Sequence, residues 1–193
     1  MAGFACLSLT IDATRLNEPH LANIAGDTSG EPVLVSGRVL APDGQPLAGA
    51  LLDVWQASAE GLYDVQDSNQ PDMNLRGKFR TDAQGQYAFR TIKPAFYSIP
   101  ADGPVGKMLK ATGRHTYRPA HIHFIVSAVG YESVTTELFA EGDPYLNSDA
   151  VFGVRDSLVV DFVRHPSSEE AAQYNISAPF YAVHYDFVLK PAS

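Results

Sequence analysis

Glycine and proline interrupt this sequence along its whole length, with 15 glycines and 13 prolines among 193 residues. Both are poor helix formers, glycine by about 1 and proline by about 3 kcal/mol relative to alanine. That density of breakers argues against long helices. The intervals between the breakers are short and contain many β-branched and aromatic residues, which is typical of strands. The sequence therefore predicts an all-β protein.

Strands at this spacing, separated by turn signals, predict one antiparallel β-sandwich domain. The expected strands are Pro32–Leu40, Ala50–Trp55, Phe79–Thr81, Gln86–Thr91, His121–Ser127, Val134–Phe139, Ser157–Val163 and Tyr181–Leu189. One short helix is expected at Val105–Thr112, closed by Gly113 just after its end. We expect residues 1–31 to form an N-terminal arm and residues 32–193 to form the sandwich.

The charge balance and the cysteine count exclude several classes of function. The chain carries 22 acidic and 14 basic residues, a formal net charge of −8, which argues against nucleic acid and anionic membranes as partners. Cys6 is the only cysteine, so an internal disulfide and a zinc–thiolate cluster are excluded. No apolar run approaches the roughly 20 residues of a membrane span, and the start lacks a signal-peptide pattern. We therefore expect a cytoplasmic protein.

The densest chemical signal is the segment RPAHIHF at residues 118–124. Residues two apart on a strand point to one face, so His121 and His123 can reach the same metal ion. Imidazole suits zinc, copper, iron and nickel alike, so the pair does not select the metal. The alternative is that both are ordinary core or surface histidines.

Tyr63 and Tyr97 are the unusual candidates for further ligands. Each lies in an irregular stretch, EGLYD and FYSIP respectively. Loop aromatics often only cover the edge of a core or make one hydrogen bond. A phenolate is a hard anionic ligand, however, and would favour a trivalent ion such as Fe(III).

Four stretches of this sequence resemble the intradiol ring-cleaving dioxygenases, most closely the hydroxyquinol 1,2-dioxygenases and next the catechol 1,2-dioxygenases. They are WQASAEGLYDVQ, RGKFRTDAQGQYAFRTIKPAFYSIPADGPVG, RHTYRPAHIHF and DPYLNSDAVFGV, and the similarity runs from about Thr14 to Phe162. The resemblance implies the family's β-sandwich core and one non-haem Fe(III) per chain. It implies Tyr63, Tyr97, His121 and His123 as the metal ligands. It also implies catalytic roles for Tyr97, as a ligand that leaves and takes a proton, and for Arg118 beside the substrate ring.

The resemblance further implies the reaction and its partners. Both atoms of O2 would be inserted into a small catechol-type diol, hydroxyquinol in the first instance, to give a cis,cis-muconate or maleylacetate-type diacid. Leu16 and Pro19 would form one wall of the substrate pocket, Val151 another, and Arg118 would contact the substrate. Substituted catechols are the alternative substrates. A non-catalytic transthyretin-like binding module is the alternative function, since VSGRVLAPDGQPLAGALLDVW and FRTDAQGQYAF are common in such modules.

The sequence also departs from the family pattern. Typical members begin with a helical domain that makes the dimer, whereas only about thirty residues precede the sandwich here, so we expect any homo-oligomer to use a non-helical interface. Glu18 and His20 stand where a Gly-Pro-aromatic stretch is usual, and they would recognise a third hydroxyl or face solvent. Glu137 stands where catechol dioxygenases carry a glutamine near the metal ligands. Its carboxylate would add negative charge near the iron or pair with Arg118.

Overall fold

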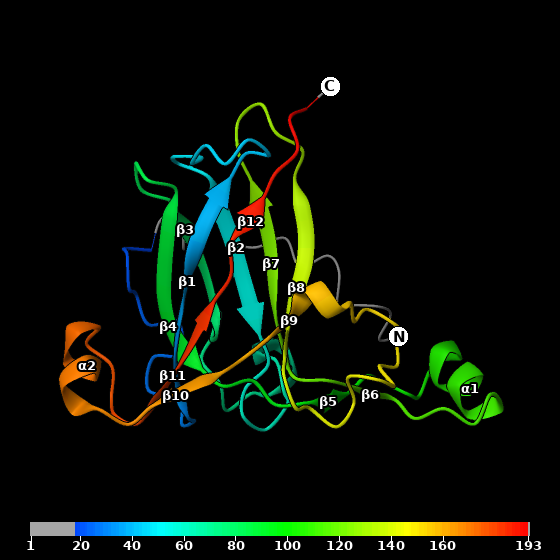
Figure 1. The fold of residues 1–193 in the computed structure, drawn as a ribbon. Helices are drawn as coiled ribbons and strands as arrows, with labels where there is room; N and C mark the ends of the chain where they lie inside the picture. Colours follow the sequence, from blue (N-terminus) through cyan, green and yellow to red (C-terminus); the bar gives the residue numbers. More distant parts are fainter. Residues whose placement is uncertain (1–17, 193) are drawn as a thin grey trace.

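The computed structural model describes residues 18–192, which form two five-stranded sheets and one two-stranded sheet (Figure 1). The first sheet contains β1 (Pro32–Leu40), β4 (Gln86–Ile92), β10 (Val163–His165), β11 (Phe180–His184) and β12 (Phe187–Val188). The second contains, in order, β3 (Arg76–Arg80), β2 (Leu51–Gln56), β7 (His121–Ser127), β8 (Val134–Ala140) and β9 (Val159–Val160). The all-β sandwich is confirmed.

The main core lies between these two sheets. Val33 and Val35 from β1 and Phe89 from β4 pack in one cluster with Ile122 and Phe124 from β7, and all five are almost fully buried. Burying side chains of this kind contributes about 1.5–3 kcal/mol each. Because alternate residues of β7 enter this core, the residues between them must face the other side of the sheet.

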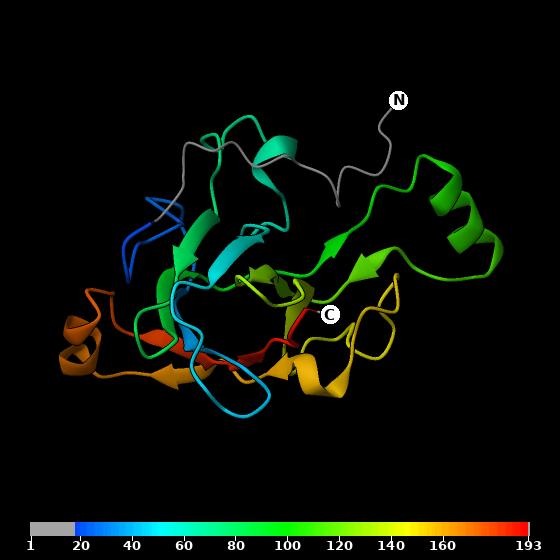
Figure 2. The ribbon, with the colours of Figure 1, turned by 90° about the horizontal axis from the view of Figure 1, so that it is seen from above.

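The two-stranded sheet belongs to an arm that leaves one end of the sandwich. The arm runs through β5 (Tyr97–Ser98), α1 (Pro104–Ala111) and β6 (Tyr117–Arg118), and α1 lies well away from the two large sheets in both views (Figures 1 and 2). Pro104 occupies the start of α1, and Gly113 follows its end with φ +68°. The predicted helix is therefore confirmed, one residue earlier than expected at each end.

A second helix, α2 (Ser168–Gln173), was not expected from the sequence. It lies on the opposite side of the sandwich from α1 (Figure 2). The Ser167 side chain caps it by accepting a hydrogen bond from the Glu170 N–H. Ser followed three residues later by Glu is a recognised helix-start pattern, so the signal was present in the sequence. Two short 3₁₀ turns, η2 (Asp64–Gln66) and η3 (Asp156–Leu158), are the remaining elements within residues 18–192.

The two C-terminal strands expected from the sequence are each divided. The segment expected at Ser157–Val163 contains the end of η3, then β9, and the start of β10, because the chain crosses there from the second sheet to the first. The segment Tyr181–Leu189 is divided into β11 and β12, which both pair with β1 in parallel. At this break the Tyr185 carbonyl approaches Gly37 so closely that a Cβ there would lie 1.8 Å from the oxygen. The pairing of β8 with β9 is also parallel. Of the eight strand pairings within the two large sheets, three are therefore parallel and five are antiparallel.

The described part of the N-terminal segment packs on the sandwich. The Leu21 and Ile24 N–H groups donate to carbonyls of β4 at Ala88 and Arg90, and Ile24 enters the main core. The boundary expected at residue 31 stays a prediction. Over residues 18–192, the structure has no helix that is both long and apolar enough to cross a membrane.

Candidate metal centre

His121 and His123 lie on β7 and face away from the main core, as their spacing predicts. The two Nε2 atoms are 3.0 Å apart, and both residues are buried. The His121 Nδ1 lies 2.7 Å from the Pro119 carbonyl oxygen. A carbonyl can only accept, so Nδ1 carries the proton and Nε2 presents its lone pair to the shared space.

The two predicted tyrosines complete this cluster from outside the sheet. Tyr63 lies directly before η2, and Tyr97 lies on β5. The Tyr63 hydroxyl is 3.0 Å from Nε2 of His123 and 3.1 Å from the hydroxyl of Tyr97. Residues separated by up to 60 positions along the chain therefore present two phenol oxygens and two imidazole nitrogens to one point.

The spacing of these four atoms fits a single metal ion. Protein nitrogen and oxygen donors lie about 2.0–2.2 Å from a metal such as zinc. Two donors at that distance and roughly at right angles are about 3 Å apart, as observed between neighbours in this cluster. A set of two phenols and two imidazoles, with no thiolate, suits a hard trivalent ion better than a soft one.

Both histidines are held in the neutral form that binds metals. Burial, and next the positive charge of Arg118, lower the pKa of His121 to about 4. Burial and the neighbouring His121 lower the pKa of His123 well below its ordinary value. At neutral pH a metal ion would therefore have no imidazole proton to displace.

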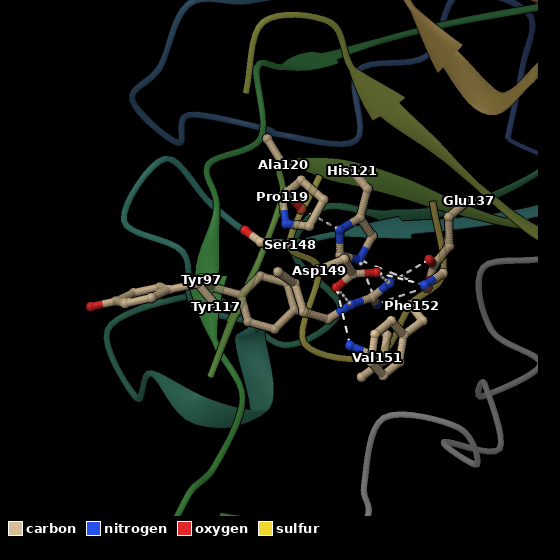
Figure 3. Close-up of polar contacts among 12 residues, drawn as sticks. Tyr97, Tyr117, Pro119, Ala120, His121, Glu137, Ser148, Asp149, Val151 and Phe152 are labelled. Carbon is tan, nitrogen blue, oxygen red and sulfur yellow. Dashed lines mark hydrogen bonds and ion pairs between the residues drawn. The ribbon is translucent and has the colours of Figure 1, made fainter. Parts of the chain in front are cut away.

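Arg118 lies beside the cluster and is held by two carboxylates, those of Glu137 and Asp149, which Figure 3 labels. Glu137 accepts from both terminal nitrogens, at 2.8 and 2.6 Å, and Asp149 accepts from Nε at 3.2 Å and from Nη2 at 3.4 Å. Burial alone would lower the pKa of Arg118, but the hydrogen bonds and charge of Glu137, followed by Asp149, raise it above the ordinary value. The remaining contact, from Nη1, is directed at Nε2 of His121 at 3.2 Å. One N–H of Arg118 is therefore aimed at the point where the four candidate ligands meet.

Glu137 connects Arg118 to the histidines. Its Oε1 lies 3.2 Å from Nδ1 of His123 and 3.9 Å from Nε2 of His121, so these three residues form a compact group. The sequence allowed two roles for Glu137, and one of them, an ion pair with Arg118, is present in the structure.

Two supporting residues were missed by the sequence reasoning. The Trp55 ring stacks on the His123 imidazole, with centroids 4.6 Å apart and planes within 5°. Asp149 is almost fully buried, and it also accepts the Gly153 N–H at 2.8 Å. Sequence alone offers little signal for either, because both act across long sequence separations.

The residues expected to line a substrate pocket have different outcomes. Val151 is half exposed and lies beside Asp149 (Figure 3). Pro19 is exposed, and the preceding residue Glu18 donates its N–H to the Lys78 carbonyl on β3. His20 is also exposed. Leu16 lies outside the described residues, so the pocket walls stay a prediction.

Comparison with known proteins shows the family of this chain. The hydroxyquinol 1,2-dioxygenase of Rhizobium sp. (strain MTP-10005) is 53% identical over 173 residues, covering 89% of this chain and 59% of that protein. An intradiol ring-cleavage dioxygenase of Aspergillus niger is 44% identical over 168 residues, covering 87% of this chain and 51% of that protein. A family model described as Dioxygenase matches residues 9–191. The chain belongs to the intradiol dioxygenase family.

The fold of this intradiol dioxygenase chain also matches solved structures. The structure of hydroxyquinol 1,2-dioxygenase from Pseudomonas putida DLL-E4 aligns with a TM-score of 0.86 at 45% identity, covering 94% of this chain and 63% of that one. The chain spans between a half and three fifths of the length of the two curated relatives described above. The resemblance predicted from the sequence motifs is confirmed.

Proposed function

We propose that this chain is a non-haem Fe(III) dioxygenase that cleaves a catechol-type ring between its two hydroxyl-bearing carbons. The observation that carries the proposal is the convergence of Tyr63, Tyr97, His121 and His123 at about 3 Å between neighbouring donor atoms. Membership of the intradiol dioxygenases and the names of the relatives support the reaction class.

The donor set suits one Fe(III) ion per chain, held by the two phenols and the two imidazoles. Bound Fe(III) supplies a Lewis acid for the two oxygens of a diol and an acceptor of electron density from the ring. The stacking of Trp55 on His123, and the Pro119 carbonyl on His121, fix the orientation of the imidazoles. Such outer contacts orient ligands and tune the metal they hold.

Tyr97 is the proposed acceptor of a substrate proton. Its hydroxyl lies 3.1 Å from the Tyr63 hydroxyl. A tyrosinate is a competent base for the phenolic hydroxyl of a diol, because the two groups are of similar acidity. Tyr97 would therefore change from ligand to base when a diol binds.

Arg118 is the proposed stabiliser of negative charge on the substrate. Its carboxylate partners, Glu137 and Asp149, hold the guanidinium so that Nη1 faces the cluster. A positioned donor of this kind contributes about 2–4 kcal/mol to a charged transition state, by analogy with oxyanion holes. The cation is already in place, so little reorganisation is needed during the reaction.

Hydroxyquinol is the proposed substrate, together with O2, and catechols are second. The support is that the Rhizobium relative and the solved structure from Pseudomonas putida DLL-E4 are both hydroxyquinol 1,2-dioxygenases. Val151, Pro19 and Leu16 are the proposed pocket walls. We place the protein in the cytoplasm, with the single Cys6 consistent with a reducing compartment.

The test is oxygen uptake and formation of the ring-opened diacid by the iron-loaded protein with hydroxyquinol and with catechol. We expect one O2 consumed per diol cleaved, and a loss of turnover in Tyr63→Phe and Tyr97→Phe. Tyr87→Phe is the matched control, because the Tyr87 hydroxyl bonds to the Tyr185 carbonyl away from this cluster. Ring cleavage that persists unchanged in both ligand variants would overturn the proposal.

A further inference from the structure

The segment that carries Tyr63 is closed on itself by polar contacts. Gln66 accepts the Tyr63 N–H with its side-chain oxygen at 3.0 Å and donates its own N–H to the Tyr63 carbonyl at 2.9 Å. Further along, Gln70 donates to the Leu62 carbonyl, and Asn74 donates to the Gln70 side chain. This loop therefore has a fixed shape although it contains only one short 3₁₀ turn.

Asp64, the residue after Tyr63, joins this loop to the second sheet. Its Oδ1 accepts from Nε and Nη2 of Arg76 at 3.0 and 2.8 Å, and its Oδ2 accepts the Met73 N–H at 3.0 Å. Both charged side chains are only 6% exposed. Met73 has φ +64°, a conformation that side chains other than glycine adopt at a cost. Such backbone persists where surrounding contacts hold it, as the Asp64 carboxylate does here.

Arg76 begins a row of side chains that leads to the metal centre. Arg76 on β3 pairs with Trp55 on β2, and Trp55 pairs with His123 on β7. Residues paired across neighbouring strands present their side chains on the same face of the sheet. The Trp55 ring stacks on the His123 imidazole, with centroids 4.6 Å apart. The Asp64–Arg76 pair thus lies between the Tyr63 loop and the strand that carries the histidines.

A neighbouring ion pair differs from the Asp64–Arg76 pair in the elements that carry its two members. Lys78 on β3 and Asp53 on β2 are 3.4 Å apart and lie on the same face, two residue pairs further along the same two strands. Both members of that pair belong to the sheet itself, whereas Asp64 belongs to the loop. A buried ion pair contributes little net stability, since desolvation offsets the attraction. Stability alone therefore does not account for the placement of Asp64 and Arg76.

We infer that the Asp64–Arg76 ion pair positions the Tyr63 phenol against the histidines for metal binding. This inference rests on the proposed function, because it assigns a role to two residues that support the proposed iron site. Asp64 and Arg76 are positioning residues, acting through the Tyr63 loop and through Trp55. The planar guanidinium is essential to the role, since two of its N–H groups converge on Oδ1 of Asp64 while Oδ2 holds the Met73 N–H.

The test compares Arg76→Lys and Asp64→Asn with Asp53→Asn as the matched control. Arg76→Lys keeps the charge and loses the planar pair of N–H donors that converge on Oδ1 of Asp64. We expect iron retained during dialysis against a chelator to fall about tenfold to a hundredfold in the Arg76 and Asp64 variants, as for other outer contacts of metal ligands. The visible band of the iron–tyrosinate should also shift. Asp53→Asn should retain the iron and the band of the wild type, with at most a change in thermal midpoint.

A double variant, Asp64→Asn with Arg76→Gln, covers the case in which a single change prevents folding, because it leaves no buried charge unpaired. We expect it to fold and to retain iron as poorly as Arg76→Lys. Iron retention and a visible band equal to those of Asp53→Asn in these variants would overturn the inference. A wild-type protein that binds no iron would instead overturn the proposed function, so the two failures are distinguishable.

Discussion

The two halves of the candidate metal centre are positioned in different ways. His121 and His123 lie on β7, in the middle of a five-stranded sheet, where regular backbone hydrogen bonds and the core below fix the strand. Tyr63 and Tyr97 lie on a closed loop and on a two-stranded arm. Their placement depends on side-chain contacts such as those of Gln66 and on the pairing of β5 with β6.

This difference has consequences for how each half responds to change. The sheet half is supported by apolar burial, so its position is coupled to the stability of the whole sandwich. The loop and arm half is supported by local polar contacts and by a small apolar cluster of Ala57, Tyr63 and Tyr97 that is separate from the main core, so it can be displaced while the sandwich stays folded. Variants should therefore separate loss of metal from loss of fold.

The largest effect is expected from removing a ligand in the sheet half. His121→Ala should lower iron affinity more than a hundredfold, since losing an outer contact alone costs about 10–100-fold. The sandwich should stay folded, because the histidine side chain faces away from the main core. Iron content after dialysis and the thermal midpoint measure the two effects. His115→Ala is the control, since that histidine contacts Ser148 instead; equal iron loss in both variants would contradict the assignment.

The second-largest effect is expected on stability, from a change in the core beneath the histidines. Phe124 is completely buried on the opposite face of β7. Phe124→Ala should cost about 3–5 kcal/mol of unfolding free energy, through lost burial and the cavity left behind. Denaturant unfolding measures this cost. A change below about 1 kcal/mol, well under the usual range for phenylalanine, would show that the sheet half does not depend on this core.

Gly153→Ala should affect catalysis while leaving the metal in place. A Cβ at Gly153 would lie 3.0 Å from Nη2 of Arg118, 3.1 Å from Oδ2 of Asp149 and 3.2 Å from Oε2 of Glu137. The side chains of Arg118, Asp149 and Glu137 must shift by a few tenths of an ångström to accommodate this Cβ. We expect kcat/KM for the diol to fall about tenfold, equivalent to about 1.4 kcal/mol. Unchanged kcat/KM would mean that the position of Arg118 is not critical.

Tyr87→Phe should have the smallest effect, confined to the fold. The buried Tyr87 hydroxyl donates to the Tyr185 carbonyl at 2.8 Å, and the change should cost about 1 kcal/mol of stability. Burial raises the pKa of Tyr87 well above its ordinary value of 10.0. The folded state therefore favours the neutral phenol, so this tyrosine's contribution is complete below pH 10 and falls as the pH rises further. Thermal unfolding of the wild type and of Tyr87→Phe from pH 7 to 11 tests this. A stability advantage of the wild type over the variant that increases above pH 10 would refute it.

The sheet half could be predicted from sequence, and the reasons are local. The limits of β1 and β7 agree with the expected strands, because an uninterrupted apolar run or alternation marks each of them. The His-x-His spacing on β7 then places both imidazoles on one face by strand geometry alone. The breaks at Asp161 and at Tyr185 were not predicted, because they depend on a crossing between sheets and on the space left by Gly37.

The loop half could be assigned only by resemblance. Nothing in the local sequence around Tyr63 or Tyr97 indicates that the two phenols meet, since their approach depends on the arm and on contacts such as Asp64 with Arg76. The pairing of Arg118 with Glu137 was one of two roles open from the sequence. Asp149 was missed because its contact spans 31 positions in an irregular segment.

The central claim is that two phenols and two imidazoles form one iron site that accepts a diol. The most direct test is the visible spectrum of the iron-loaded protein before and after anaerobic addition of hydroxyquinol, with iron measured on the same sample. The account predicts a red protein with about one iron per chain and a tyrosinate-to-iron band that shifts when the diol is added. A protein that stays colourless after iron is supplied would contradict it.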